Sequence, residues 1–167
     1  MTTENKKIGI AGIGNLLMGD EGFGVHVANY LIENYDFPEN VDVQDIGTAG
    51  IYMAPFLETC DPVFIIDVVD IEAEPGSYHF FNEDDFKNVS IHNKMSPHQL
   101  GVLEILEVCK LRGEHPQKIE FHTIVPNKLE ETITLSALAE QRKIEIAEKL
   151  LGRLEELGVT VTKKNEA

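Results

Sequence analysis

Three side chains that can bind a metal ion or transfer a proton follow separate apolar runs of the chain. Glu21 lies in the glycine-rich stretch 12–24 (GIGNLLMGDEGFG), Asp67 lies near the end of the apolar run 62–69, and His98 follows Pro97. Two carboxylates and an imidazole form a mixed oxygen and nitrogen ligand set. Such a set suits a borderline divalent transition metal and leaves positions open for ligands from another molecule. Asp67 is also a candidate general base.

The elements expected around these residues alternate between strands and helices. Short apolar or alternating runs predict strands, and apolar residues at helical spacing predict helices. The predicted strands are at residues 7–13, 41–46, 62–69, 77–81 and 118–125. The predicted helices are at residues 22–35, 51 to about 59, 97 to about 112, and 135–157.

Several connections between these elements carry their own signals. The turn 47–50 (GTAG) opens the second predicted helix, and residues 82–93 are acidic and are expected to be irregular. Ser96 and Gln99 form a capping-box pattern with Pro97 at the first helical position, so a helix is predicted to begin there. The connection after residues 62–69 is too short for a crossover helix. We therefore expect that strand and residues 77–81 to form an antiparallel hairpin.

This element order predicts a three-layer α/β/α sandwich whose five-stranded sheet is mostly parallel, with one antiparallel strand. The whole chain, 1–167, is expected to be one domain with a core of about 7–157 and polar tails at both ends. In such a sheet Glu21 follows the first strand, Asp67 ends the third, and His98 opens the third helix. All three are then expected at one crevice on the carboxyl edge.

The charge and composition exclude several classes of protein. A formal net charge of -15 removes the usual electrostatic basis for binding nucleic acids or anionic membranes. Cys60 and Cys109 are far apart and are expected to be buried free thiols. The polar N-terminus lacks the apolar core of a secretory signal, and no run approaches the length of a membrane span. We expect a cytoplasmic protein, with a monomer as the default state.

Other active-site signatures are missing. A dinucleotide loop would need a third glycine where Leu17 stands, and the carboxylates of Asp20 and Glu21 would oppose a pyrophosphate. Walker, HExxH and GxSxG patterns are absent.

Structural explanations of the same residues stay open. Asp20 and Glu21 are also favourable charges before a helix N-terminus. Asp67 also fits a strand-end acid that accepts backbone N–H groups, and His98 fits a helix-start residue paired with a carboxylate. The other histidines are expected to be surface or strand residues without a special role; they are His26, His79, His92, His115 and His122.

Four ordered motifs resemble those of the hydrogenase maturation proteases. They are GIGNLLMGDEGFG at 12–24, DIGTAG at 45–50, IIDVVD at 65–70 and NKMSPHQLG at 93–101. The resemblance covers about residues 7–157. Members of that family are endopeptidases that trim the C-terminal extension from the large-subunit precursor of nickel-iron hydrogenases after nickel insertion. One departure is Ile46, where the family commonly has glycine, while Asp45 and Thr48 match.

The resemblance implies a twisted five-stranded sheet in an α/β/α sandwich. It also implies that Glu21, Asp67 and His98 recognise nickel already held by the precursor, so that no permanent cofactor is needed. A docking protein that checks for nickel in the same precursor without cutting it is the main alternative. A dinucleotide-binding domain is a weaker one, and it would require a thermal shift with NAD or FAD.

Overall fold

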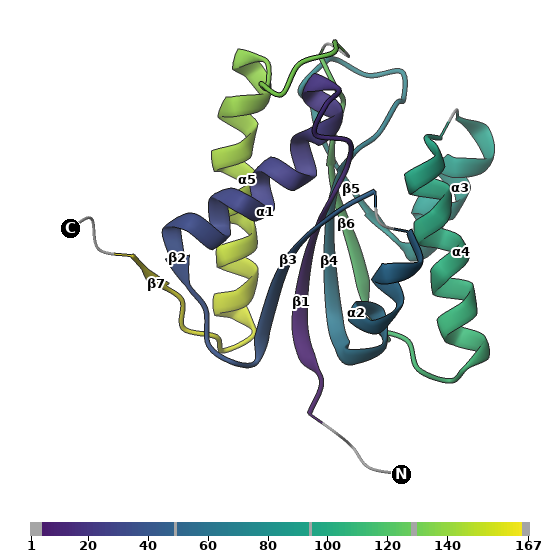
Figure 1. Ribbon diagram of the computed structural model, residues 1–167, viewed down its shortest axis with the longest axis vertical. Helices are drawn as coiled ribbons and strands as arrows, with labels where there is room; N and C mark the ends of the chain where they lie inside the picture. Colours follow the sequence, from purple (N-terminus) through teal and green to yellow (C-terminus); the bar gives the residue numbers. More distant parts are fainter. Residues whose placement is uncertain (1–4, 49, 94, 128–129, 165–167) are drawn as a thin grey trace.

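The structure is a computed structural model that describes residues 5–48, 50–93, 95–127 and 130–164. Its main sheet has five strands in the order β3-β1-β4-β6-β5 (Figure 1). Only β5 is antiparallel to its neighbour. The strands are β1 (Lys7–Ile13), β3 (Val41–Gly47), β4 (Cys60–Val68), β5 (Tyr78–Asn82) and β6 (Ile119–Ile124). The predicted mostly parallel sheet with one antiparallel strand is confirmed.

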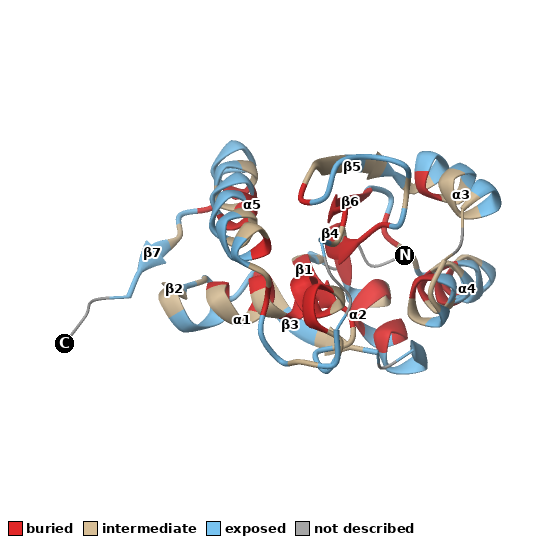
Figure 2. Ribbon diagram, turned by 90° about the horizontal axis from the view of Figure 1, so that it is seen from above, coloured by how far each residue is buried: buried red, intermediate tan, exposed pale blue. Residues whose placement is uncertain are grey.

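Five α-helices and two 3-10 helices among the described residues complete the fold. They are η1 (Gly19–Gly22), α1 (Phe23–Asn34), η2 (Gly50–Met53), α2 (Ala54–Thr59), α3 (Glu83–His92), α4 (Pro97–Leu111) and α5 (Ala137–Glu156). Helices α1 and α5 cover one face of the sheet, and α2, α3 and α4 cover the other (Figures 1 and 2). The predicted three-layer sandwich is therefore confirmed.

Two apolar layers hold the helices to the sheet. Ile10 and Phe64 point into the layer under α1 and α5, whereas Ala11 and Ile65 point into the layer under α2 and α4. Strand β6 is buried along its whole length, because helices cover the sheet on both faces. No helix in the described part of the chain is long and apolar enough to cross a membrane.

The predicted antiparallel hairpin between residues 62–69 and 77–81 is wrong. Strand β5 is antiparallel, but its partner is β6, with Phe81 opposite Phe121. Strand β4 pairs in parallel with β1 on one side and with β6 on the other. Strand β6 takes the interior place and is buried on both faces. Strand β5 remains partly exposed at the edge of the sheet.

The irregular stretch expected at residues 82–93 is also wrong, because most of it forms α3. The Asn82 side chain caps this helix by accepting the backbone N–H of Asp85 at 2.8 Å. Three acidic residues follow in the first turn, where they favour the helix dipole. Phe86 anchors the helix by stacking on Phe121 with ring centroids 4.0 Å apart.

A short strand lies beyond the predicted core, within the C-terminal tail. Residues Thr162–Lys163 form a short strand, β7, which pairs with β2 (Tyr35–Asp36). Parts of several predicted segments lie outside the described residues. They are residues 1–4 and 165–167 of the predicted tails, Ala49 of the predicted 47–50 turn, Lys94 of the NKMSPHQLG motif and residues 128–129 of the loop after β6.

The glycine at position 24 allows α1 to lie directly on the sheet. A Cβ at Gly24 would overlap the backbone oxygens of Ile66 and Ile13, neither of which can move freely. We expect Gly24→Ala to destabilise the protein by about 2 kcal/mol or more through this overlap. Gly101→Ala is the matched control, because nothing lies within 4 Å of its added methyl group. That control should stabilise α4 slightly.

Thermal unfolding of both variants measures this difference. The result that contradicts a close approach at position 24 is an equal melting temperature for Gly24→Ala and the unmodified protein.

Candidate functional site

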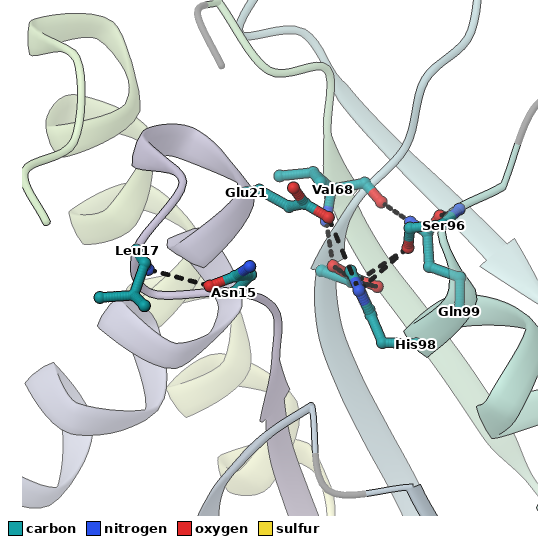
Figure 3. A network of polar contacts seen from close by, with 8 residues as sticks. Asn15, Leu17, Glu21, Val68, Ser96, His98 and Gln99 are labelled. Atoms are coloured by element: carbon teal, nitrogen blue, oxygen red, sulfur yellow. Dashed lines mark hydrogen bonds and ion pairs between the residues drawn. The ribbon is translucent and has the colours of Figure 1, made fainter. Parts of the chain in front are cut away.

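The structure brings the three predicted side chains together at the carboxyl edge of the sheet, where Figure 3 shows Glu21 and His98. Glu21 comes from η1, Asp67 from the end of β4 and His98 from the first turn of α4. The Nδ1 atom of His98 lies 3.6 Å from Glu21 Oε1, and its Nε2 atom lies 3.3 Å from Asp67 Oδ2. One imidazole thus bridges two carboxylates that are distant in sequence.

Glycines shape the loop that carries Glu21. Gly14 and Gly19 have φ angles of 145° and 56°, which side chains rarely adopt. A Cβ at Gly14 would also overlap the carbonyl oxygen of Glu21, so the loop folds back closely on itself. This tight path leads from β1 into η1 and places the Glu21 side chain beside His98, with 20% of it exposed.

Asp67 is almost fully buried and is the most enclosed member of the group. It is 1% exposed, and its Oδ1 atom accepts the backbone N–H of Val68 at 2.7 Å. The prediction that Asp67 is a strand-end acid that accepts a backbone N–H group is thus confirmed. It does not account for the imidazole that lies against the other side of the carboxylate.

The start of α4 fixes the position of His98. The helix begins at Pro97 with the predicted capping box, in which the Ser96 N–H donates to Gln99 Oε1 at 2.9 Å. The Gln99 side chain also donates to the carbonyl oxygen of Val68, and this bond ties α4 to the end of β4. The Ser96 hydroxyl lies 3.0 Å from His98 Nδ1.

Ser96 and Gln99 therefore position the site, a role that the sequence analysis missed when it treated them only as helix caps. The available signal was their placement two residues before and one residue after His98.

Asp20 has a different role from its neighbour Glu21. Its carboxylate is 1% exposed and accepts three hydrogen bonds, from the Asn127 N–H at 2.9 Å, the Ser136 N–H at 2.8 Å and the Ser136 hydroxyl at 2.8 Å. Ser136 is the N-cap of α5. Asp20 therefore anchors the glycine-rich loop to the segment before α5 and does not face His98.

Burial and charge shift the pKa values of the two enclosed groups. Burial raises the pKa of Asp67, although contact with His98 and bonds from Val68 and Gln99 oppose the rise. Burial disfavours the charged form of His98, but Asp67 and Glu21 outweigh that effect and raise its pKa. Each of the two side chains thus holds a proton up to a higher pH than it would in water, Asp67 because it is buried and His98 because carboxylates surround it.

The raised pKa values of Asp67 and His98 predict that stability depends on pH. Because the folded-state pKa of His98 is raised, its contribution is complete below the unfolded value of about 6.5 and is lost as the pH rises through the folded value. The raised pKa of Asp67 acts in the same direction. We expect the melting temperature to fall as the pH rises above about 6.5. His98→Gln should flatten that fall, whereas an unchanged pH profile in the variant would contradict the assignment.

A pocket of about 260 Å³ opens next to the site, and Glu21 lines it, whereas Asp67 and His98 lie behind its wall. Its walls include Glu21, Asp70, Met95, Ser96 and Pro126. Within the described ranges, no three His, Cys, Asp or Glu side chains are already arranged to hold a metal ion by themselves. Each ring nitrogen of His98 is instead directed at a different carboxylate. The donor types fit a transition metal, and coordination by His98 requires that it give up its proton and one of these contacts.

Fold and site together define an α/β protein with a compact acid–imidazole group at the carboxyl edge of its sheet. A family model described as hydrogenase maturation protease matches residues 25–153, which contain Asp67 and His98. The chain belongs to the hydrogenase maturation protease family, a family of endopeptidases.

Individual relatives agree with this assignment. The chain is 32% identical over 154 residues to the hydrogenase 2 maturation protease of Escherichia coli (strain K12), covering 92% of this chain and 93% of that protein. The structure resembles the hydrogenase maturating endopeptidase HybD from E. coli with a TM-score of 0.87, at 31% identity and over 95% and 98% of the two chains.

The extent of the match differs between relatives. The chain is 35% identical over 131 residues to the hydrogenase expression/formation protein HupM of Azotobacter chroococcum mcd 1. That match covers 78% of this chain and 63% of HupM, so the chain spans less than two thirds of the length of that relative. Glu21 precedes the residues matched by the family model, and its place in the site rests on the geometry alone.

Proposed function

We propose that the protein is an endopeptidase that removes the C-terminal extension from the large-subunit precursor of a nickel-iron hydrogenase. The observation that carries this proposal is the meeting of Glu21, Asp67 and His98, with Glu21 in the wall of an open pocket, in a chain of the hydrogenase maturation protease family. The nickel is part of the precursor and acts as a feature of the substrate. On this proposal the protein needs no permanent metal of its own.

The three side chains supply complementary donors to nickel held by the precursor. Glu21 is the most exposed of the three and offers a carboxylate oxygen at the mouth of the site. Asp67 offers a second oxygen from a rigid strand, and His98 offers a nitrogen after it releases its proton. Nickel shared between precursor and protease would place the scissile bond next to the pocket. A water whose pKa is lowered by the metal then attacks the bond.

Asp67 is the second candidate for activating that water. Its raised pKa is the direction that a general base working near neutral pH requires. Only 2% of its side chain is exposed and it does not line the pocket, so the water would have to reach it past Glu21 or His98. Either route makes Asp67 essential.

Mass spectrometry of the precursor tests the function itself. Incubation with the protein should shorten a nickel-loaded precursor by the mass of its C-terminal extension and leave a nickel-free precursor intact. A nickel-loaded precursor that binds but keeps its full mass would identify the protein as a checkpoint that docks without cutting. Trimming of the nickel-free precursor at the same rate would refute recognition of nickel.

A further inference from the structure

A second groove lies between α5 and the strands β5 and β6, away from the site described above. Its volume is about 430 Å³, and its walls include Tyr78 and Phe80 from β5 and Lys149 and Gly152 from α5. Glu120 and His122 of β6 form part of its lining and lie opposite Phe64 and Ile66 of β4, whose side chains are in the layer under α1 and α5. Helix α5, which forms one wall of the groove, covers the opposite face of the sheet from α4 (Figure 1).

A buried chain of polar groups underlies this groove. Tyr78 Oη lies 2.7 Å from His122 Nδ1, and Arg153 donates to Glu120 Oε2 at 2.7 Å. His122 is only 2% exposed, and its Nε2 atom is buried without a hydrogen-bond partner, although Glu120 Oε1 lies 3.4 Å away. The Glu120 carboxylate is therefore the neighbour that offsets the burial of this nitrogen, and the pair forms a polar floor beneath the groove.

Three cations, Lys118, Lys149 and Arg153, line the groove against two carboxylates, Glu120 and Glu156, and Arg153 is paired with both carboxylates. Burial opposes ionisation of Glu120, but His122 and Arg153 lower its pKa to about 2, so this carboxylate is ionised and already neutralised by its partners. Lys118 has a side chain that is 62% exposed and lies 3.9 Å from Glu120, a loose contact. Lys149 lies over the ring of Tyr78 at 4.8 Å and makes no ion pair with any described residue. Two ammonium groups thus remain available in a protein whose net charge is -15.

Gly152 keeps the helical wall of the groove open. It lies inside α5, where glycine costs about 1 kcal/mol relative to alanine. Its φ angle is not positive, and nothing lies within 4 Å of an added Cβ, so neither backbone strain nor close packing requires glycine there. The missing side chain leaves space opposite Phe80, a phenylalanine that is 48% exposed.

We propose that this groove binds a small organic oxyanion, a phosphate or a carboxylate attached to a flat apolar body. The oxyanion lies between Lys149 and Lys118. The apolar body lies on Phe80, in the space left by Gly152. This site is independent of the proposed peptidase function, since it shares no residue with the group formed by Glu21, Asp67 and His98.

Titration with phenyl phosphate, followed by the backbone amide signals in NMR spectra, tests this site. Saturable shifts are expected at Tyr78, Phe80 and Gly152, and inorganic phosphate should bind more weakly because it lacks the apolar body. Lys149→Gln should weaken binding of phenyl phosphate about 5-fold or more, the loss expected for one charge contact of about 1 kcal/mol.

Lys143→Gln is the matched control for the lost charge. Lys143 is also on α5 and also lies over a tyrosine ring, that of Tyr30 at 5.5 Å, but it is outside the groove. This variant should change the affinity less than about 2-fold. Gly152→Leu provides a second variant, which should fill the groove and abolish binding while it leaves α5 folded, because leucine favours helices more than glycine does.

Benzoate distinguishes the two sources of the oxyanion. Tighter binding of phenyl phosphate than of benzoate assigns the groove to phosphates, and the reverse order assigns it to carboxylates; either order supports the site. Absence of saturable shifts with both probes would overturn the proposal. An equal loss of affinity in Lys143→Gln and Lys149→Gln would also overturn it, because it would show attraction to the helix surface in general.

Discussion

Asp67→Asn is expected to reduce trimming of a nickel-loaded precursor by about 10²-fold to 10³-fold, the usual cost of removing one positioned charged group from an active site. The change exchanges one carboxylate oxygen for an amide nitrogen at the point where β4 meets α4. The fold should survive, because the asparagine side chain keeps an oxygen that can accept the Val68 N–H. Precursor mass measured over time gives the rate, and the melting temperature shows that the variant is folded.

Asp61→Asn is the matched control for this loss. Asp61 is on the same strand, at the opposite end, where it accepts the backbone N–H groups of Gln117 and Lys118. It should process the precursor at nearly the unmodified rate. We expect Glu21→Gln and His98→Ala to resemble Asp67→Asn. Normal rates in all three variants would exclude this group of residues as the site of processing.

Asp20→Ala is expected to lower stability by about 3–5 kcal/mol, the largest structural effect that we predict, because it breaks three hydrogen bonds to one buried carboxylate. The N–H groups of Asn127 and Ser136 would lose their acceptor, and the start of α5 would lose its link to the glycine-rich loop. In a protein of this size, a loss of this order lowers the melting temperature by roughly 10 °C.

Glu21→Gln is the natural comparison, because it changes the next residue along the chain. Glu21 accepts no such set of backbone bonds and lies partly exposed beside His98. The Glu21→Gln variant should keep a melting temperature within a few degrees of that of the unmodified protein, while its processing of the precursor is lost. If Glu21→Gln instead destabilised the protein as strongly as Asp20→Ala, the two carboxylates would share a structural role and the assignment of Glu21 to the site would be wrong.

The fold was predictable wherever one local signal determined an element. Pro97 with the Ser96 and Gln99 capping box specified the start of α4, and Gly113, with a φ angle of 75°, follows its end. The apolar runs that became β1 and β4 were equally clear, because strands buried on both faces contain few polar residues.

Pairing between distant strands was not predictable in the same way. Nothing local in residues 77–81 shows that β6, about 40 residues later, inserts between them and β4. The acidic residues of α3 were also misleading, since their charge suggested a loop although it favours the first turn of a helix capped by Asn82.

The candidate site was predictable in its residue types but not in its internal contacts. Strand ends in a parallel sheet meet at one edge, and this rule placed Glu21, Asp67 and His98 together. The sequence left open whether Asp20 shares the role of Glu21, and only the bonds to Asn127 and Ser136 separate the two. His122 was regarded as an ordinary strand histidine, because its unbonded nitrogen is visible only once β5, β6 and α5 are packed.

Anomalous X-ray diffraction from crystals soaked with nickel, with cadmium as a second probe, tests most directly whether Glu21, Asp67 and His98 can take nickel. A peak within bonding distance of Glu21, Asp67 and His98 is the expected result, with the imidazole turned from its bridge between the carboxylates to face the ion. Soaked crystals of His98→Ala should lose that peak. Metal bound only at a surface histidine such as His115, with the three side chains unchanged, would contradict the proposed recognition of nickel.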